Sequence, residues 1–434
     1  MLNKSVLGFM TVVLSLGIVI ATPGKSPAQG NSPPKLFDAV KEDVNNQPTS
    51  KDNLQARHHV LRTLSGILLQ ETGREDFDKV FSREKNDKIM TLSEAGNLKE
   101  AGEMIDSALL GLCRLGENTW LADIRKVSFV SLEGVKVVGY LFIPPKPVKA
   151  AFIFGHGGFG YKENWIDLIR EISNKANAYA LAIDFQGCGE SQGYTKWQGR
   201  IKDFSYAIDY LEKEFGLTKF AVGGHSGGGA YPAACAAIND VRISALTLWD
   251  CPFDFYDMHI IEGATDPGGN PAPLVERTYL ANKDKILVPT EVFKFRDIPG
   301  HLNEIYDEIE GILKNYRHPA KMLGEAQKKR KLAVLHIIAE DVLKPIGDNR
   351  MGETYFLPFE DAQGSRKRFL NRPLAFFASG LFNRPQGAWK EWEADLSEPK
   401  KFVIIENTTH GFEPPGRNQA IEETISWLKL YLSA

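Results

Sequence analysis

The amino-acid sequence predicts an α/β protein with a mostly parallel, doubly wound sheet, and three observations support this fold class. Short apolar runs of strand length, typical of buried parallel strands, recur from residue 150 onward. Between two of these runs, apolar residues recur at helical spacing and stop at Gly216, a residue typical of helix ends. Small or polar residues follow each run. Because parallel sheets bind ligands at the carboxyl ends of their strands, these segments are the place to look for function.

The expected strands follow in order along the chain. Alternating apolar residues over 127–143, broken by a turn at Glu133-Gly134, predict an antiparallel hairpin. Six apolar runs predict parallel strands at residues 150–154, 178–183, 220–222, 243–248, 332–338 and 402–405. A helical pattern over 201–215 fills the interval between the second and the third of these runs. Strands that alternate with helices in this way build a doubly wound sheet.

The first 28 residues have the pattern of a secretory signal peptide. Lys4 precedes an apolar run over residues 6–21, and small residues at 26–28 flank a cleavage point. This run is shorter than the roughly 20 residues that cross a bilayer, although an uncleaved anchor stays the alternative. We therefore expect a secreted or periplasmic protein that contacts a membrane only through this segment.

Residues 29–123 are expected to form a linker and a helical extension. A stretch rich in Pro, Asn and Ser over 29–47 predicts a flexible lead-in. Over 51–116, apolar residues recur at helical spacing in two stripes. The stripes comprise Leu54, His58, Leu61, Leu64 and Leu68, and Ala101, Met104, Ile105, Ala108 and Leu109. This pattern favours a helical cover or lid for the core over an independent binding module.

Composition narrows the classes of function. The 434-residue chain carries 52 lysines and arginines against 55 aspartates and glutamates, so no strong field favours nucleic acid or an anionic membrane. Its four cysteines show no CxxC pairing, which argues against a metal site built from them. They are Cys113, Cys188, Cys235 and Cys251, and one disulfide among them is left open.

A candidate nucleophile follows the run at 220–222. Residues 223–230 read Gly-Gly-His-Ser-Gly-Gly-Gly-Ala and contain Gly-x-Ser-x-Gly between a predicted strand and a predicted helix. A serine on such a strained turn needs glycine two residues before and after it, because side chains there would hold the strand and the helix apart. Ser226 is thus predicted to project its hydroxyl into a cleft, against the alternative of a passive serine in a glycine-rich turn.

Later strand ends can supply a base and an acid. His410 lies in the loop after the last predicted strand, where an imidazole could take the proton of Ser226. Asp341 follows the predicted strand at 332–338 and is the preferred residue to fix the tautomer of His410. Glu340 beside it and Asp250, one strand earlier, are the alternative acids.

The glycine-rich loop after the first parallel strand has two interpretations. Residues 155–160 read Gly-His-Gly-Gly-Phe-Gly, and Asp184 follows at the distance that a dinucleotide-binding fingerprint requires. That interpretation leaves the serine, acid and histidine loops without a role, so an oxyanion hole is favoured. The backbone amides of Gly227 and of Gly158 or Phe159 would stabilise a tetrahedral oxyanion. The turn that begins at Asp184 is assigned no chemistry.

These motifs, in this order, resemble the α/β-hydrolase superfamily. The resemblance covers residues 124–434 and rests on residues 156–158, the turn at Asp184, residues 224–228, and the later acid and histidine. The hairpin and residues 410–412 are similar to the dienelactone-hydrolase and prolyl-oligopeptidase-like branch, although dienelactone hydrolases typically carry a cysteine nucleophile. The resemblance implies a serine hydrolase with neither a metal nor an organic cofactor.

Two long insertions, at about 253–330 and 346–400, are expected to lie over the cleft as a cap or lid. Their aromatic residues point to a bulky or aromatic substrate. We therefore expect an exported serine hydrolase that cleaves a small-molecule carboxylic ester through an acyl-enzyme. A peptidase or amidase of the prolyl-oligopeptidase-like type and a catalytically silent binding protein are the alternatives, with a dinucleotide-binding oxidoreductase the most distant. The oligomeric state is left open.

Overall fold

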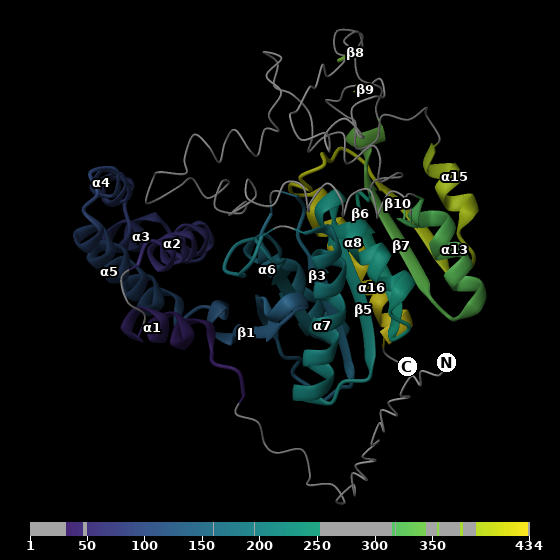
Figure 1. Ribbon diagram of the computed structural model, residues 1–434, viewed down its shortest axis with the longest axis horizontal. Coiled ribbons are helices and arrows are strands. Elements are labelled where there is room, and N and C mark those ends of the chain that lie inside the picture. Colours follow the sequence, from purple (N-terminus) through teal and green to yellow (C-terminus); the bar gives the residue numbers. More distant parts are fainter. Residues whose placement is uncertain are drawn as a thin grey trace, which may run out of the picture. The chain divides into compact units, whose positions relative to one another are not determined.

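Figure 1 shows the computed structural model of the chain. It describes residues 32–46, 50–158, 160–194, 196–251, 315–316, 318–343, 354–355, 374–375 and 388–432. The predicted signal peptide lies outside the described residues, and so does most of the two predicted insertions.

The centre of the fold is an eight-stranded mixed sheet. Its strands are β1 (Arg125–Val130), β2 (Lys136–Phe142), β3 (Ala150–Gly155), β4 (Tyr179–Asp184), β5 (Lys219–His225), β6 (Ile243–Trp249), β7 (Ala333–Ala339) and β10 (Lys400–Ile405). They lie in the order β1-β2-β4-β3-β5-β6-β7-β10. β2 pairs antiparallel with β1 and β4, and all the other neighbours are parallel. The predicted hairpin and parallel sheet are confirmed.

The order of the strands fixes where a ligand can bind. From β3 the chain moves outward to β4, and it then crosses back to β5 on the other side of β3. The sheet therefore has a topological switch point between β3 and β5, and a crevice forms outside the carboxyl ends of these two strands. The glycine-rich loop follows β3 and the candidate nucleophile follows β5, so both lie at this point.

Helices cover the sheet in packed groups. They are α6 (Ile166–Glu171), α7 (Trp197–Phe215), α8 (Ser226–Asn239), α13 (Pro319–Lys329), α15 (Ala388–Asp395) and α16 (Gly416–Leu432). α6 packs against α16, whereas α7 and α13 pack against α8; α7 and α8 lie in front of the sheet in Figure 1. Gly216 ends α7 as predicted, with a left-handed φ of 63°. A separate short antiparallel pair joins β8 (Thr354–Tyr355) to β9 (Leu374–Ala375).

In the described part of the chain, five α-helices precede the sheet, and we call them the helical unit. They are α1 (Leu36–Asn46), α2 (Lys51–Thr72), α3 (Arg74–Val80), α4 (Arg83–Glu94) and α5 (Leu98–Gly116). The two predicted stripes lie on α2 and α5, which pack against each other. Every residue of both stripes is buried except the half-buried Met104. The predicted helical extension is therefore confirmed.

The flexible lead-in predicted over residues 29–47 is wrong from Leu36 onward, where α1 begins. Leu36, Phe37 and Val40 are buried on one side of this helix, which packs against α5. A Cβ added at Gly116 would lie 2.0 Å from the ring of Phe37, so the ring occupies the space that this glycine leaves free. Burial of this apolar side stabilises a helix that the polar composition of the segment does not indicate.

Two further sequence expectations concern membranes and disulfides. No helix in the described ranges is long and apolar enough to cross a membrane. All four cysteines are buried and no disulfide joins any two of them, so the disulfide left open by the sequence is not formed.

Candidate active site

The candidate nucleophile lies on the turn that joins β5 to α8. Ser226 has a φ of 58°, a strained conformation for a residue with a side chain. A Cβ added at Gly224 would lie 2.3 Å from the carbonyl oxygen of Gly229, and one at Gly228 would lie 2.2 Å from the nitrogen of Gly158. Gly224 therefore allows the strand and the helix to approach closely, as predicted, whereas Gly228 allows the loop after β3 to approach the helix.

The loop between β10 and α16 brings His410 to this serine. Nε2 of His410 lies 3.0 Å from Oγ of Ser226, within hydrogen-bonding distance. Phe412, two residues further along, is buried and packs its ring 5.0 Å from that of Trp249. The side chain of His410 is 35% exposed. The structure therefore places the predicted base beside the predicted nucleophile, with one side of the imidazole open.

The acid beside His410 is Asp250, so the preference for Asp341 needs correction. Oδ2 of Asp250 lies 2.9 Å from Nδ1 of His410, and Oδ1 accepts a hydrogen bond of 2.8 Å from the amide of Ala339. Asp250 is fully buried and follows β6 directly. Asp341 instead belongs to η5 (Glu340–Leu343), a short helix that follows β7. The position on Nδ1 is thus taken by the carboxylate at the end of the neighbouring strand.

Glu340, the other alternative acid, contacts the backbone of the histidine loop. Its Oε2 accepts a hydrogen bond of 2.8 Å from the amide of Asn407. Asn407 has a left-handed φ of 53° at the start of this loop. Glu340 therefore supports the loop that carries His410.

The hydrogen-bonding partners define where the protons lie. A carboxylate can only accept, so Nδ1 of His410 donates to Oδ2 of Asp250. In the neutral imidazole Nε2 then carries a lone pair and accepts from the hydroxyl of Ser226. This tautomer is the one that can take a proton from the serine.

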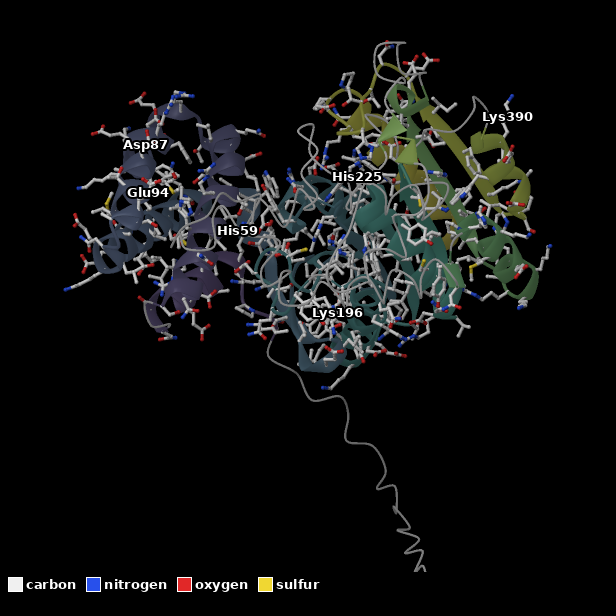
Figure 2. The ribbon with its side chains drawn as sticks, turned by 45° about the horizontal axis from the view of Figure 1, so that its top comes forward. His59, Asp87, Glu94, Lys196, His225 and Lys390 are labelled. Atoms are coloured by element: carbon white, nitrogen blue, oxygen red, sulfur yellow. The ribbon has the colours of Figure 1, made fainter. Side chains whose placement is uncertain are left out.

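His225, at the variable position of the serine motif, is a functional candidate that the sequence did not single out. Its Nε2 lies 2.8 Å from the carbonyl oxygen of His410, to which it donates, and the two rings lie 4.7 Å apart at 33°. Burial and the neighbouring His410 hold the pKa of His225 well below its usual value. A neutral ring therefore stacks on the candidate base and holds its backbone. Figure 2 labels His225 within this part of the fold.

The loop after β3 passes close to the nucleophile turn. A Cβ added at Gly157 would lie 3.4 Å from Cβ of Ser226, whereas one at Gly158 would have no neighbour within 4 Å. Gly227 lies in the first turn of α8, where amides have no acceptor within the helix. Gly227 thus follows the serine directly, and the loop that carries Gly158 passes beside it, while Phe159 lies outside the described residues.

The dinucleotide-binding alternative would have Asp184 bind a ribose. In the structure, groups of the protein itself already bind this carboxylate. Oδ1 accepts from the amide of Lys162 at 2.9 Å, and Oδ2 accepts from Nζ of Lys162 at 2.7 Å and from the amide of Glu190 at 3.0 Å. Burial opposes ionisation of Asp184, but Lys162, His156 and His59 together outweigh it, and the pKa of Asp184 is lowered. Asp184 therefore fastens the loop after β3 to the end of β4.

The side chains around His410 also have donor types that suit a metal site. Ligand atoms of His225, Asp250 and His410 lie within 4.8 Å of one another. However, Asp250 and His410 are bonded to each other, and Nε2 of His225 is bonded to a carbonyl oxygen. A cation would have to break these bonds, so the donor set fits a chain of hydrogen bonds better than a metal.

Known proteins share parts of this architecture. The alpha/beta hydrolase fold family matches residues 150–270, which include β3, the nucleophile turn and Asp250. The alpha/beta hydrolase domain-containing protein WAV2 of Arabidopsis thaliana is 30% identical over 95 residues. These residues make up 21% of this chain and 31% of WAV2, so the chain matches about a third of that relative's length.

Solved structures with a similar chain course include DcsB in complex with its substrate analogue, at a TM-score of 0.47 and 14% identity. Another is the esterase domain of a Rhodothermus marinus protein, at a TM-score of 0.42 and 15% identity. Each similarity covers 71% of this chain and 99% of the other.

Proposed function

We propose, from the α/β-hydrolase fold of this chain, that the protein is a serine hydrolase that cleaves a carboxylic ester of a small molecule. The observation that carries the proposal is the chain of contacts from Oγ of Ser226 through the ring of His410 to Oδ2 of Asp250, at 3.0 and 2.9 Å. A nucleophile, a base in the required tautomer and a buried carboxylate are the parts that acyl transfer needs.

Each part has a defined task in the proposed reaction. Oγ of Ser226 attacks the ester carbonyl while Nε2 of His410 takes its proton, and Asp250 stabilises the imidazolium that forms. The amides of Gly227 and Gly158 donate to the tetrahedral oxyanion. His410 then passes the proton to the leaving alcohol, which yields an acyl-enzyme at Ser226. A water molecule activated by the same imidazole completes hydrolysis.

Labelling of the nucleophile tests this proposal. We expect a fluorophosphonate to add once to the native chain and not to a Ser226→Ala variant, as read by intact mass. The variant should lose several orders of magnitude in kcat on an ester while its far-UV circular dichroism is unchanged. A folded native chain without an adduct would favour the binding-protein alternative.

The type of bond needs its own comparison, because amide hydrolysis uses the same groups. A matched pair of substrates with one acyl group, a phenyl ester and an anilide, separates the two activities. We expect a higher kcat/KM for the ester, and bulky or aromatic acyl groups should be preferred if the aromatic insertions line the pocket. A higher kcat/KM for the anilide would instead make the protein an amidase or peptidase.

Export of the protein is part of the proposal and rests on the N-terminal sequence alone. Lys4, the apolar run at 6–21 and the small residues at 26–28 support a signal peptide. Expression of the full chain in a bacterium with fractionation should release a mature protein that begins near residue 29. An intact N-terminus in the membrane fraction would indicate an anchor.

A further inference from the structure

The helical unit contacts the chain directly after the glycine-rich loop. His59 on α2 is 2% exposed, and its ring lies 5.0 Å from that of Tyr161 at 87°, an edge-to-face contact. Nε2 of His59 also lies 3.9 Å from Oε2 of Glu163. Tyr161 caps η3 (Lys162–Trp165), the short helix to which Glu163 belongs. The side chain of one residue in the helical unit thus packs against two residues at this point.

A second contact lies nearby. The guanidinium of Arg170 on α6 lies 4.4 Å from the ring of Trp120, a cation–π distance. Trp120 belongs to η1 (Trp120–Asp123), which packs against α1 and α5. Both contacts therefore fall on residues 161–170, the segment that leads away from the loop. Figure 2 shows His59 where the helical unit meets the rest of the chain.

A chain of ion pairs joins α1 to the same segment. Nζ of Lys126 lies 2.7 Å from both Asp43 on α1 and Glu190. Glu190 continues to Nζ of Lys162 at 2.8 Å, and Lys162 reaches Asp184 at 2.7 Å. The side chain of Lys162 is fully buried and that of Lys126 is 13% exposed. Charged side chains with so little solvent exposure depend strongly on their ion-pair partners for stabilisation. The position of each side chain in this series therefore constrains the position of the next.

Lys162, in the last ion pair of this chain, is separated from the predicted oxyanion loop only by a tight turn. The amide of Gly160 donates to the carbonyl of Gly157 at 3.0 Å. A Cβ added at Gly160 would lie 3.2 Å from the nitrogen of Gly157, which shows how closely the turn is closed. Lys162 follows two residues later, with both its amide and its Nζ bound to Asp184. A shift of Lys162 would therefore be passed to the loop.

We infer that the helical unit is a positioning part of the proposed active site: through His59 and the ion pairs of Lys126 it holds residues 161–163, and thereby the oxyanion loop. The inference rests on the proposed serine hydrolase function. Catalysis depends on sub-ångström placement of oxyanion donors, and a misplacement of 1 Å costs about a hundredfold in rate. The unit is then neither a separate binding module nor a removable extension.

Two variants in the helical contact and one matched control test the inference. His59→Ala removes the ring on Tyr161, and Lys126→Met removes the central cation. Lys196→Met is the control, because Lys196 is also a lysine with little exposure, 11%, that pairs with a carboxylate, Glu133, at 2.7 Å, but it lies away from His59 and His225 in Figure 2. We expect the two variants to lose about 10- to 100-fold in kcat with KM within twofold, and the control to stay within twofold in both.

A second readout separates positioning from loss of structure. A trifluoromethyl ketone that forms a tetrahedral adduct with the serine should bind the His59 and Lys126 variants more weakly by the same factor as kcat falls, because both measure the oxyanion donors. Circular dichroism spectra and Tm values of all variants are measured first, and the assays are run at a temperature at which every variant is folded. If Lys126→Met does not fold, Asp43→Asn, at the half-exposed outer end of the chain, replaces it with a smaller expected loss in kcat.

The outcomes distinguish this inference from the proposed function. An active native chain whose folded His59 and Lys126 (or Asp43) variants keep kcat and ketone affinity within twofold would overturn the inference alone. A native chain with no ester hydrolysis and no adduct at Ser226 would overturn the proposed function and the inference with it. Equal losses in the Lys196 control would also overturn the inference, since they would show a general effect of removing a paired lysine with little exposure.

Discussion

Two aspartates at strand ends, Asp250 after β6 and Asp184 at the end of β4, are both fully buried and share part of their hydrogen-bonding pattern. Each uses Oδ1 to accept from a backbone amide and Oδ2 to accept from a side-chain nitrogen. For Asp250 this nitrogen belongs to His410, and for Asp184 it belongs to Lys162. The two regions therefore differ in the base that faces the carboxylate.

The partner of each aspartate decides whether the pair can take part in proton transfer or only stabilises the fold. Burial opposes the charge of Lys162, but Asp184 and its neighbours outweigh it and raise the pKa of Lys162 well above its usual value. A lysine held in this way stays charged, so the pair with Asp184 holds the loop and exchanges no proton. Nε2 of His410 accepts from the hydroxyl of Ser226, and the side chain of His410 is 35% exposed, so the same kind of pair with Asp250 can serve a reaction.

Asp250→Asn should have the largest effect on activity. The amide would favour the wrong tautomer of His410, and we expect kcat on an ester to fall by about 10⁴-fold, as for the corresponding change in known serine triads. Asp341→Asn is the matched control and should keep kcat within about twofold. Initial rates on one reporter ester measure both. A large loss in the Asp341 variant with an active Asp250 variant would restore the original assignment of the acid.

Asp184→Asn should affect stability more than chemistry. Removal of one partner leaves Lys162 buried with less charge compensation, which costs about 3–5 kcal/mol in the free energy of unfolding. Urea unfolding followed by circular dichroism measures this loss. Glu133→Gln, which breaks the pair of Lys196 with a 60% exposed carboxylate, should cost no more than about 1 kcal/mol. Equal losses in the two variants would show that burial of the pair at Asp184 has no special weight.

The sequence predicts local features well and choices between distant partners poorly. The strands and the turn at Ser226 depend on neighbouring residues, so the glycine pattern and the apolar runs predict them. The choice between Asp250 and Asp341 depends on which of two adjacent strand ends meets a loop some 70 to 160 residues later along the chain. An acid at the last position of a strand or directly after it, as at Asp184 and Asp250, is a signal that could have been weighed.

Two other features were missed for related reasons. α1 lies in a segment whose polar composition hides four buried apolar residues, and its stability comes from packing on α5. His225 occupies a position of the motif that tolerates many side chains, and its partner, the carbonyl of His410, lies 185 residues away. Neither contact can be derived from local spacing.

A third buried carboxylate, Asp203 on α7, extends the comparison to a site with neutral donors. The hydroxyl of Ser131 and the amide of Gln186 donate to it. Burial raises the pKa of Asp203 to about 7, because these bonds and the nearby Arg200 offset only part of the cost of its charge. A hydrogen-bonding donor alone therefore does not keep a buried carboxylate ionised as Lys162 does.

Asp203→Asn should flatten the dependence of stability on pH. Between about pH 4 and 7 the unfolded chain has lost the proton of Asp203 while the folded chain keeps it, so the native protein loses stability as pH rises through this window. Asparagine has the same shape and can accept from Gln186 and donate to Ser131. The difference in Tm between variant and native chain should therefore shift in favour of the variant from pH 4 to 7.5. A constant difference would show that Asp203 is ionised throughout.

The smallest effect is expected at His225, which binds the backbone carbonyl of His410 but takes no part in the proposed proton transfer. His225→Phe keeps a ring against His410 but leaves its carbonyl without the donated bond, and His225→Gln keeps a donor without the stacked ring. We expect the Phe variant to lose about tenfold in kcat, comparable with one lost hydrogen bond of roughly 1.4 kcal/mol, and the Gln variant to lose less. Both should keep KM within twofold, because the substrate is not the partner of this bond. If the Gln variant loses more than the Phe variant, stacking and not the carbonyl bond holds the base, and unchanged kcat in both would remove His225 from the site.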